Sequence, residues 1–432
     1  MPGTHSLALF GGSPAVTGQV FYTWPPIPDE DARLLTDMTL RGELSYYGRE
    51  GHVEELEDKF AQYIGVPHAL ATSSGTTGLH SAYFGLGLAP GDEVLAPTYT
   101  FLATVTPLFV VNAIPVLVDA DPLTGNIDPA DLERRITDRT RAIVVTHLWG
   151  NPVDMPAVMD VARRHGLKVV EDCSHAHGAE VAGRKVGAFG DVAVFSLQGK
   201  KLVSAGQGGI LLTGDREIFE RAVLLGHFKV RAEQEVESAA YRPYVDTGFG
   251  LNYRMHPLAS ALANRQMDRL EEYIAGRQHN LDYLSKLLTE IPGVRPPAAG
   301  PHVDRQVYYT YKPTYLPEEL DGLPIETYVR ALQAEGVPVE QYGAIPLHQE
   351  NIFQGDVPPL VSHGDPARFS GDGHRRRYQN RDLPNAEYYA RHLLSLPPYT
   401  DPARELMDQF AVAFQKVADH HHELRRHANG RR

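Results

Sequence analysis

The chain has 432 residues, and its 54 acidic against 41 basic residues give a formal net charge of −13. This acidic balance disfavours nucleic acid or an anionic membrane as the main partner. The single cysteine, Cys173, excludes an internal disulfide framework and fits a reducing, cytoplasmic environment. No apolar run approaches the roughly 18 residues that a spanning helix needs. The proline-rich first thirty residues lack the apolar core of a signal peptide.

Short apolar runs alternate with helical patterns over about the first half of the chain. Residues 154–166 predict a helix that Asp154 caps and Gly166 ends. Alternation of strands and helices predicts a mostly parallel sheet covered on both faces, with ligands bound beyond the carboxyl ends of its strands. The runs that predict buried strands, because they are rich in Val, Ile and Leu, are residues 94–99, 114–119, 142–150, 167–172, 192–197 and 209–214.

The pattern changes after about Arg254. Residues 256–291 predict one long helix, residues 307–316 alternate as a strand does, and residues 325–335 predict another helix. These elements are typical of a small α+β domain.

We therefore expect two domains. Residues 1–253 would form an N-terminal segment and a large α/β domain, and residues 254–432 a long connecting helix and a small domain. Two stretches, residues 229–248 and 362–380, are predicted to be loops.

A Ser/Gly/Thr turn runs directly into a helical pattern at residues 71–88. Backbone amides at such a helix start attract a phosphate, and Gly75 would let the chain approach it closely. The same turn would also serve as an ordinary helix cap. The turn therefore predicts either a phosphate site or a plain helix start.

Asp172 stands at the end of a predicted strand. A carboxylate in this place can keep a pyridinium nitrogen protonated, which makes the ring an electron sink. Its alternatives are a helix cap, a salt bridge or, together with His175 and His177, a metal site. We expect no metal, because no further cluster of ligands accompanies these residues.

Two adjacent lysines, Lys200 and Lys201, follow the strand that ends near Ser196 and precede a glycine-rich turn. A lysine that forms an imine must be desolvated, which lowers its pKa, and held at a fixed distance from the carbonyl. A lysine in a tight turn after a strand meets both demands, although two solvated surface lysines would look the same. Spacing alone does not decide between the two.

Together these segments resemble the sugar aminotransferase family known as DegT/DnrJ/EryC1/StrS, and the resemblance covers almost the whole chain. It implies an α/β fold of the aspartate-aminotransferase type, fold type I, with a mostly parallel sheet of about seven strands flanked by helices. A smaller C-terminal α+β domain would follow. It also implies pyridoxal 5′-phosphate (PLP) as the cofactor.

The family's lysine motif begins with a serine and reaches the Schiff-base lysine five residues later. Laid on this sequence, the motif selects Lys201 over Lys200 and makes Ser196 a phosphate ligand. The resemblance also implies that the amides of Gly75 and Thr76 bind the phosphate.

Further residues take their expected roles from the same resemblance. Asp172 would face the pyridine nitrogen, His175 would pack near the ring, and Phe101 would stack on it. Lys201, Asp172 and His175 are the expected catalytic residues. Asn252 would reach the phosphate of a neighbouring subunit, which implies a homodimer with shared active sites.

The sequence departs from the family pattern at several places. Gln207 stands where the family usually has a glutamate, so the chain loses a negative charge near the cofactor. Gln198 replaces a histidine of many relatives, as in the branch that aminates keto-cyclitols of aminoglycoside pathways. The insertion at residues 362–380 is not typical.

The implied function is a ping-pong aminotransfer from glutamate or glutamine to a ketone of a sugar, free or nucleotide-linked, or of a cyclitol. Tyr46, Tyr47, Gln198 and His348 fall where relatives build the substrate pocket, although each could be a packing or turn residue. Secondary-metabolite or cell-surface sugar biosynthesis is the expected setting. The alternatives are a family dehydratase, in which a histidine replaces the lysine, and a regulator that kept the fold without catalysis.

Overall fold

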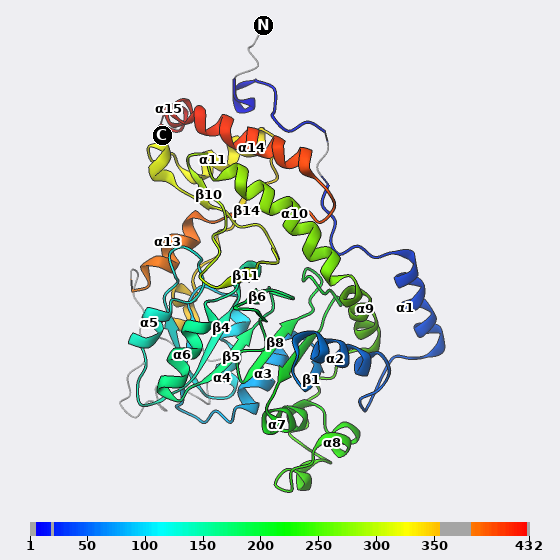
Figure 1. Cartoon of the computed structure of the whole chain (residues 1–432). Helices are drawn as coiled ribbons and strands as arrows, with labels where there is room; N and C mark the ends of the chain where they lie inside the picture. Colours follow the sequence, from blue (N-terminus) through cyan, green and yellow to red (C-terminus); the bar gives the residue numbers. More distant parts are fainter. Residues whose placement is uncertain (1–5, 19–20, 355–381, 430–432) are drawn as a thin grey trace.

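The computed structural model of the chain describes residues 6–18, 21–354 and 382–429. A seven-stranded sheet lies at its centre with helices on both faces, and a second helical unit sits at the far end of the long helix α10 (Figure 1). The predicted insertion at residues 362–380 lies outside the described residues.

The central sheet confirms the predicted mostly parallel arrangement. Its order is β1-β9-β8-β5-β4-β2-β3, and only β9 runs against its two neighbours. All six predicted strands are present, and the structure adds β1 at one edge. The strands are β1 His68–Thr72, β2 Glu93–Pro97, β3 Ile114–Val118, β4 Thr140–Thr146, β5 Lys168–Asp172, β8 Val192–Ser196 and β9 Gly209–Thr213.

Successive side chains of each strand enter two different cores. In β4, Ile143 and Val145 pack with α2, α6 and α9, whereas Ala142 and Val144 pack with α3, α4 and α7. Asp154 caps α6 and Gly166 ends it, as predicted. The helices of this part are α1 Asp29–Arg41, α2 Gly51–Ile64, α3 Gly75–Gly85, α4 Pro107–Val110, α5 Pro129–Arg134, α6 Met155–His165, α7 Arg216–Gly226 and α8 Val230–Glu235.

A third core lies in the second unit, where α10, α11 and α14 pack around Tyr311 and Tyr315. Leu7 and Val16 belong to this core, although the sequence places them with the large domain. The elements of this part are α9 Pro257–Asp268, α10 Leu270–Leu288, α11 Ile325–Ala334, α13 Pro384–His392, α14 Arg404–Asp419, α15 His421–Asn429, β10 Val294–Arg295, β12 Thr314–Tyr315, β13 Glu340–Gln341 and β14 Leu394–Ser395. A small separate sheet is formed by β6 Glu180–Val181, β7 Arg184–Lys185 and β11 Val303–Arg305.

Three predictions of local structure were wrong. The single helix expected over 256–291 is two helices, which meet at Arg269, where the backbone leaves the helical conformation. The segment 307–316 forms a strand only at Thr314–Tyr315, and Tyr308 has a positive φ of 46°. The loop expected at 229–248 contains the helix α8 and a 3-10 turn, Arg242–Tyr244.

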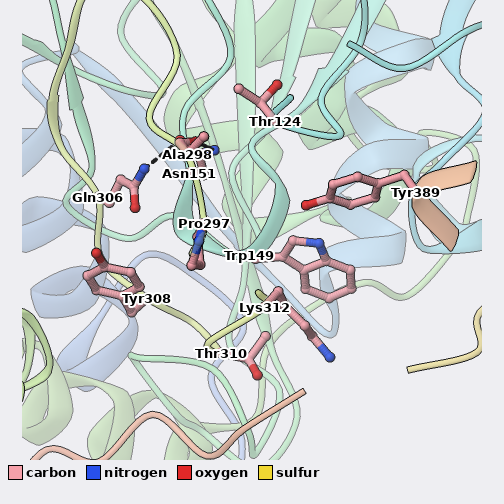
Figure 2. Close-up of a pocket in the computed structure, with 10 residues that line it drawn as sticks. All are labelled: Thr124, Trp149, Asn151, Pro297, Ala298, Gln306, Tyr308, Thr310, Lys312 and Tyr389. Atoms are coloured by element: carbon pink, nitrogen blue, oxygen red, sulfur yellow. Dashed lines mark hydrogen bonds between the residues drawn. The ribbon is translucent and has the colours of Figure 1, made fainter. Parts of the chain in front are cut away.

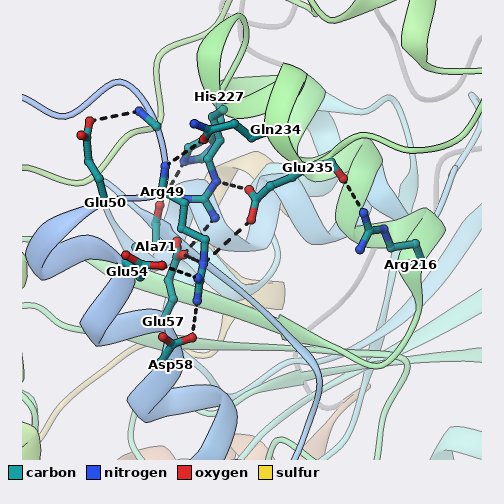
Figure 3. Close-up of polar contacts among 12 residues, drawn as sticks. Arg49, Glu50, Glu54, Glu57, Asp58, Ala71, Arg216, His227, Gln234 and Glu235 are labelled. Atoms are coloured by element: carbon teal, nitrogen blue, oxygen red, sulfur yellow. Dashed lines mark hydrogen bonds and ion pairs between the residues drawn. The ribbon is translucent and has the colours of Figure 1, made fainter.

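A buried ion-pair network fixes α8 against α2 and the sheet (Figure 3). The Glu57 side chain of α2 is fully buried and contacts two arginines, Arg231 of α8 at 2.9 Å and Arg49 at 3.1 Å. Its second oxygen accepts a hydrogen bond from the backbone N–H of Ala71 in β1 at 2.8 Å. The network holds α8 against α2, because Arg231 and Arg49 together neutralise the buried Glu57 carboxylate.

Glu57→Ala should lower the free energy of unfolding by about 1–3 kcal/mol, because the buried Arg231 loses one of its two carboxylate partners and keeps only Glu235. The matched control is Glu54→Ala, which removes a half-exposed partner of the same Arg49 and should cost at most about 1 kcal/mol. Urea unfolding of both variants measures the difference. Equal losses in the two variants would contradict a stabilising role for the buried network.

Candidate active site

The polar residues singled out in the sequence lie together where the parallel strands of the sheet end. Asp172 and Ser196 end neighbouring parallel strands, β5 and β8. Because β9 is antiparallel, its first residue, Gly209, pairs with Ser196 on one side and with Thr72, the last residue of β1, on the other. The helix α3 begins directly after β1, so its start lies at the same edge.

The start of α3 and Ser196 form a close-packed cradle. Ser74 caps the helix by accepting a hydrogen bond from the Thr77 N–H, and the Gly75 and Thr76 amides that follow have no partner inside the helix. A Cβ on Gly75 would lie 2.8 Å from the Ser196 Cβ, and one on Gly209 would lie 2.6 Å from the Gly75 nitrogen. Two glycines thus bring free amides beside a hydroxyl, which is a fitting arrangement for a phosphate.

The Asp172 side chain is buried, with 4% of its surface exposed. One carboxylate oxygen accepts a hydrogen bond from the Ser174 N–H at 3.0 Å, and the other accepts one from the Thr104 hydroxyl at 2.7 Å. A carboxylate held in this way keeps a fixed orientation. Among the described residues, no cluster with metal-binding spacing brings Asp172 together with His175 or His177.

Lys201 lies in the hairpin loop between β8 and β9, and its ammonium sits 4.4 Å from the centre of the Tyr309 ring. Its carbonyl accepts a hydrogen bond from the Trp24 indole at 2.9 Å. Burial lowers the pKa of Lys201 to about 8, although the charge of Asp172 acts in the opposite direction. Its neighbour Lys200 is exposed. The two lysines therefore differ in environment, and the role of Lys201 as the Schiff-base lysine stays a prediction.

The low pKa of Lys201 predicts how the amine of the cofactor-free enzyme reacts. Its neutral, nucleophilic fraction should rise as the pH increases through about 8. Labelling with acetic anhydride over a pH series, followed by peptide mass mapping, measures this midpoint. The same peptide from urea-unfolded enzyme is the control and should give the midpoint of a solvated lysine, near 10.4. A midpoint near 10.4 in both states would disprove the desolvated amine.

His175 belongs to a stack of three rings beside Lys201. It lies 4.4 Å from Tyr309 and 5.2 Å from Trp149, with interplanar angles of 12° and 15°. Burial, followed by the charge of Lys201, holds the pKa of His175 well below its usual range. A buried imidazole is therefore packed beside Lys201, and its position near the cofactor ring stays a prediction.

A second buried lysine, missed in the sequence, lies in a neighbouring pocket (Figure 2). The Lys312 ammonium is 3.5 Å from the centre of the Tyr342 ring and 4.9 Å from that of Trp149, and burial lowers its pKa to about 7. Trp149 has a positive φ of 60°, which is rare for a bulky residue. Trp149 lies three residues after the end of β4, a position that could have suggested a site residue, whereas Tyr309 and Lys312 have no such signal.

Two of the residues expected at the cofactor lie on the surface of the single chain. Phe101 follows β2 and is 64% exposed. Asn252 is exposed and accepts a hydrogen bond from the Arg254 side chain at 3.2 Å. Its segment runs antiparallel to the end of β1, as a bridge between Arg254 and Thr72 shows. Neither residue contacts Lys201 within one chain, and their cofactor roles stay predictions.

Two of the residues expected to bind the substrate, Tyr46 and Tyr47, lie apart from Lys201 within one chain. Tyr46 and Tyr47 line a pocket with Arg254, whose guanidinium lies 5.0 Å from the centre of the Tyr47 ring. Neither Lys201 nor Asp172 lines this pocket. Within one chain, the two tyrosines are therefore not part of the site around Lys201.

Gln198 and His348 have structural partners. The Gln198 side chain accepts a hydrogen bond from the Lys200 N–H at 2.9 Å, so it shapes the lysine turn. His348 is fully buried, with its ring nitrogens next to the Thr98 hydroxyl at 2.8 Å and Glu387 at 3.3 Å. This position supports a role in holding the strand end rather than a direct substrate contact. Gln207 is exposed in the hairpin loop.

The residues present fit PLP. The cradle at Gly75 and Ser196 matches its phosphate, Lys201 offers a desolvated amine, and Asp172 offers a buried carboxylate at the adjacent strand end. PLP is held in proteins by such a set, with a lysine as Schiff-base partner and an acidic residue at the pyridine nitrogen.

Comparison with known proteins gives one consistent family. The sequence profile of the DegT/DnrJ/EryC1/StrS aminotransferase family matches residues 27–362. The chain is 34% identical to L-glutamine:scyllo-inosose aminotransferase of Streptomyces griseus, over 98% of this chain and 99% of the relative. It is 36% identical to L-glutamine:2-deoxy-scyllo-inosose aminotransferase of Streptoalloteichus tenebrarius, over 97% and 99%.

A solved structure agrees with these relatives. The crystal structure of DesI in the presence of its TDP-sugar product matches with a TM-score of 0.79 at 28% identity, and covers 99% of this chain and 100% of that chain. The expected fold and cofactor are thereby confirmed. The chain belongs to the DegT/DnrJ/EryC1/StrS aminotransferase family and is a PLP-dependent enzyme.

Proposed function

We propose that the enzyme transfers the amino group of L-glutamine to the ketone of a polyhydroxylated cyclitol. The observation that carries this proposal is the similarity over nearly the full length to two aminotransferases whose names give L-glutamine and an inosose as their substrates. Gln198, in the lysine turn, is consistent with the same branch. A nucleotide-linked keto sugar is the second candidate, because the similar structure of DesI was solved with a TDP-sugar product.

The residues around the cofactor would divide the chemistry among them. When bound, PLP would supply an electron sink for the negative charge that develops as the donor carbon loses its proton. Lys201, as the amine beside that carbon, would take up this proton and return it as general base and acid. Asp172 would keep the ring nitrogen protonated, and the start of α3 with Ser196 would hold the phosphate. The presence of Lys201 argues against the dehydratase alternative, in which a histidine takes its place.

A panel of ketones tests this proposal. The purified enzyme with L-glutamine should convert scyllo-inosose or its 2-deoxy form into the amine, detected by product mass, faster than a TDP-linked keto sugar. L-glutamate in place of L-glutamine is the donor control. Loss of water instead of gain of an amino group would favour the dehydratase. Amination of simple α-keto acids alone would disprove the substrate class.

We further propose a homodimer with shared active sites. Support comes from the exposed side chains of Phe101 and Asn252, the two residues that the family resemblance assigns to the cofactor. Mixing inactive Lys201→Ala chains with inactive Asn252→Ala chains should restore part of the activity through hybrid dimers. A fully active monomer in sedimentation would contradict this arrangement.

The cellular location of the enzyme and its domain boundary are proposals as well. None of the described helices is both long and apolar enough to cross a membrane. We propose a cytoplasmic enzyme with two domains that divide near residues 253 and 254, with residues 6–16 counted in the second domain because Leu7 and Val16 pack in its core.

A further inference from the structure

Three threonine hydroxyls form a chain that ends on the Asp172 carboxylate. The Thr100 hydroxyl donates a hydrogen bond to the Thr146 hydroxyl at 3.0 Å, and Thr146 donates to Thr104 at 3.3 Å. The Thr104 hydroxyl then donates to an Asp172 oxygen at 2.7 Å, the shortest step of the chain. These residues come from three separate segments: the turn after β2, the end of β4 and the end of β5.

The direction of the chain follows from counting protons. A threonine hydroxyl has one proton to donate and two lone pairs that accept. An ionised carboxylate can only accept, so the proton of Thr104 is committed to Asp172. Thr104 must therefore accept from Thr146 or from Thr100, which lies 2.9 Å away. The upstream hydroxyls thus hold Thr104 in the rotamer that donates to the carboxylate.

Thr104 is itself fixed from the other side. Its side chain is fully buried, and its carbonyl accepts a hydrogen bond from the buried Tyr83 hydroxyl. Together with the Ser174 N–H, the Thr104 hydroxyl gives each Asp172 oxygen one partner inside the protein. Hydrogen bonds to an ionised carboxylate are roughly twice as strong as those between neutral groups, so this pair resists rotation of the carboxyl group.

We propose that Thr104 is a positioning residue that aims the Asp172 carboxylate at the pyridine nitrogen of the cofactor. The proposal rests on the role of Asp172 in the proposed function. Thr104 touches neither substrate nor cofactor and acts only through Asp172. Its effect should therefore appear in interactions of the ring nitrogen and not in those of the phosphate or the aldehyde.

The test compares two cofactors in the cofactor-free enzyme, PLP and its 1-deaza analogue, which has a carbon in place of the ring nitrogen. Thr104→Val keeps the shape and removes the hydroxyl. It should weaken PLP binding by about tenfold, the effect of one lost hydrogen bond to a charged group, and change binding of the analogue by less than about twofold. Thr104→Ser, which restores the hydroxyl, should recover PLP binding.

Two further results decide the outcome. An equal loss of affinity for both cofactors in Thr104→Val would overturn the proposal, because it would show a merely structural role. In an Asp172→Ala background, Thr104→Val should have no further effect on PLP binding, and an additive loss would also overturn the proposal.

The role of Asp172 is checked separately by Asp172→Asn, which should itself weaken PLP more than the analogue. Equal weakening would overturn the proposal by removing its premise about Asp172. If Asp172→Asn weakened PLP binding more than binding of the analogue and Thr104→Val did not, the proposal for Thr104 alone would be overturned. These binding measurements need no ketone, so they are independent of the substrate.

Discussion

Lys201→Ala should lower turnover by roughly 10³-fold or more and abolish covalent attachment of the cofactor. The substitution removes both the amine that forms the Schiff base and the group that moves the proton. The structure gives this lysine a desolvated amine over the Tyr309 ring. Absorbance of the purified protein, and mass mapping of the cofactor-labelled peptide after borohydride reduction, measure the covalent attachment.

Lys200→Ala is the matched control. Lys200 is exposed, so any ion pair that its ammonium forms contributes only about 0–1 kcal/mol to stability. Lys200→Ala should therefore keep the cofactor absorbance and most of the activity. Recovery of the label on Lys200 would overturn the assignment of the Schiff-base lysine. Recovery of the label on neither lysine would contradict covalent attachment of the cofactor through this turn.

Gly209→Ala should weaken PLP binding by more than about tenfold and destabilise the fold by about 1–3 kcal/mol. The added Cβ would lie 2.5 Å from the carbonyl carbon of Ser74 and 2.6 Å from the Gly75 nitrogen, and both are backbone atoms that no rotamer change can move away. Displacing them would shift the first amides of α3, where the phosphate is expected. Titration of the cofactor-free variant and a thermal melt measure the two effects.

Gly214→Ala is a suitable control because it lies one residue beyond the same strand and a Cβ there would meet nothing within 4 Å. Its affinity for PLP and its melting temperature should stay close to those of the unchanged enzyme. If Gly209→Ala bound PLP as tightly as Gly214→Ala, the phosphate would not lie at the start of α3.

The sheet could be predicted because its strands are buried runs with a strong local signal. Runs such as Ile143 to Val145 contain β-branched residues that favour a strand whatever they contact. The strand β1 was missed, since two of its five residues are alanines, and it forms through its pairing with β9. Its conformation depends on a partner about 140 residues further along the chain, which local patterns do not contain.

The break between α9 and α10 at Arg269 also lacks a local sequence signal. No proline or glycine marks it, but the Arg269 side chain contacts Asp31 of α1 at 2.7 Å, a residue 238 positions away. At the candidate active site, the sequence motifs predicted that Lys201, Asp172 and Ser196 belong to one site. The ring stack of Trp149, His175 and Tyr309 escaped prediction because it joins separate segments, and stacking has no sequence period.

The antiparallel strand β9 also sets the order in which the enzyme can be completed during synthesis. β1 is synthesised early, but β9, its neighbour among the described strands of the sheet, begins at Gly209. At roughly 5–20 residues per second, several seconds or more pass before that partner exists. Until then β1 lacks this partner strand, and the start of α3 lacks Gly209, the residue against which it packs. A nascent chain shorter than about half the protein therefore exposes the edge of an unpaired strand and holds no finished phosphate cradle.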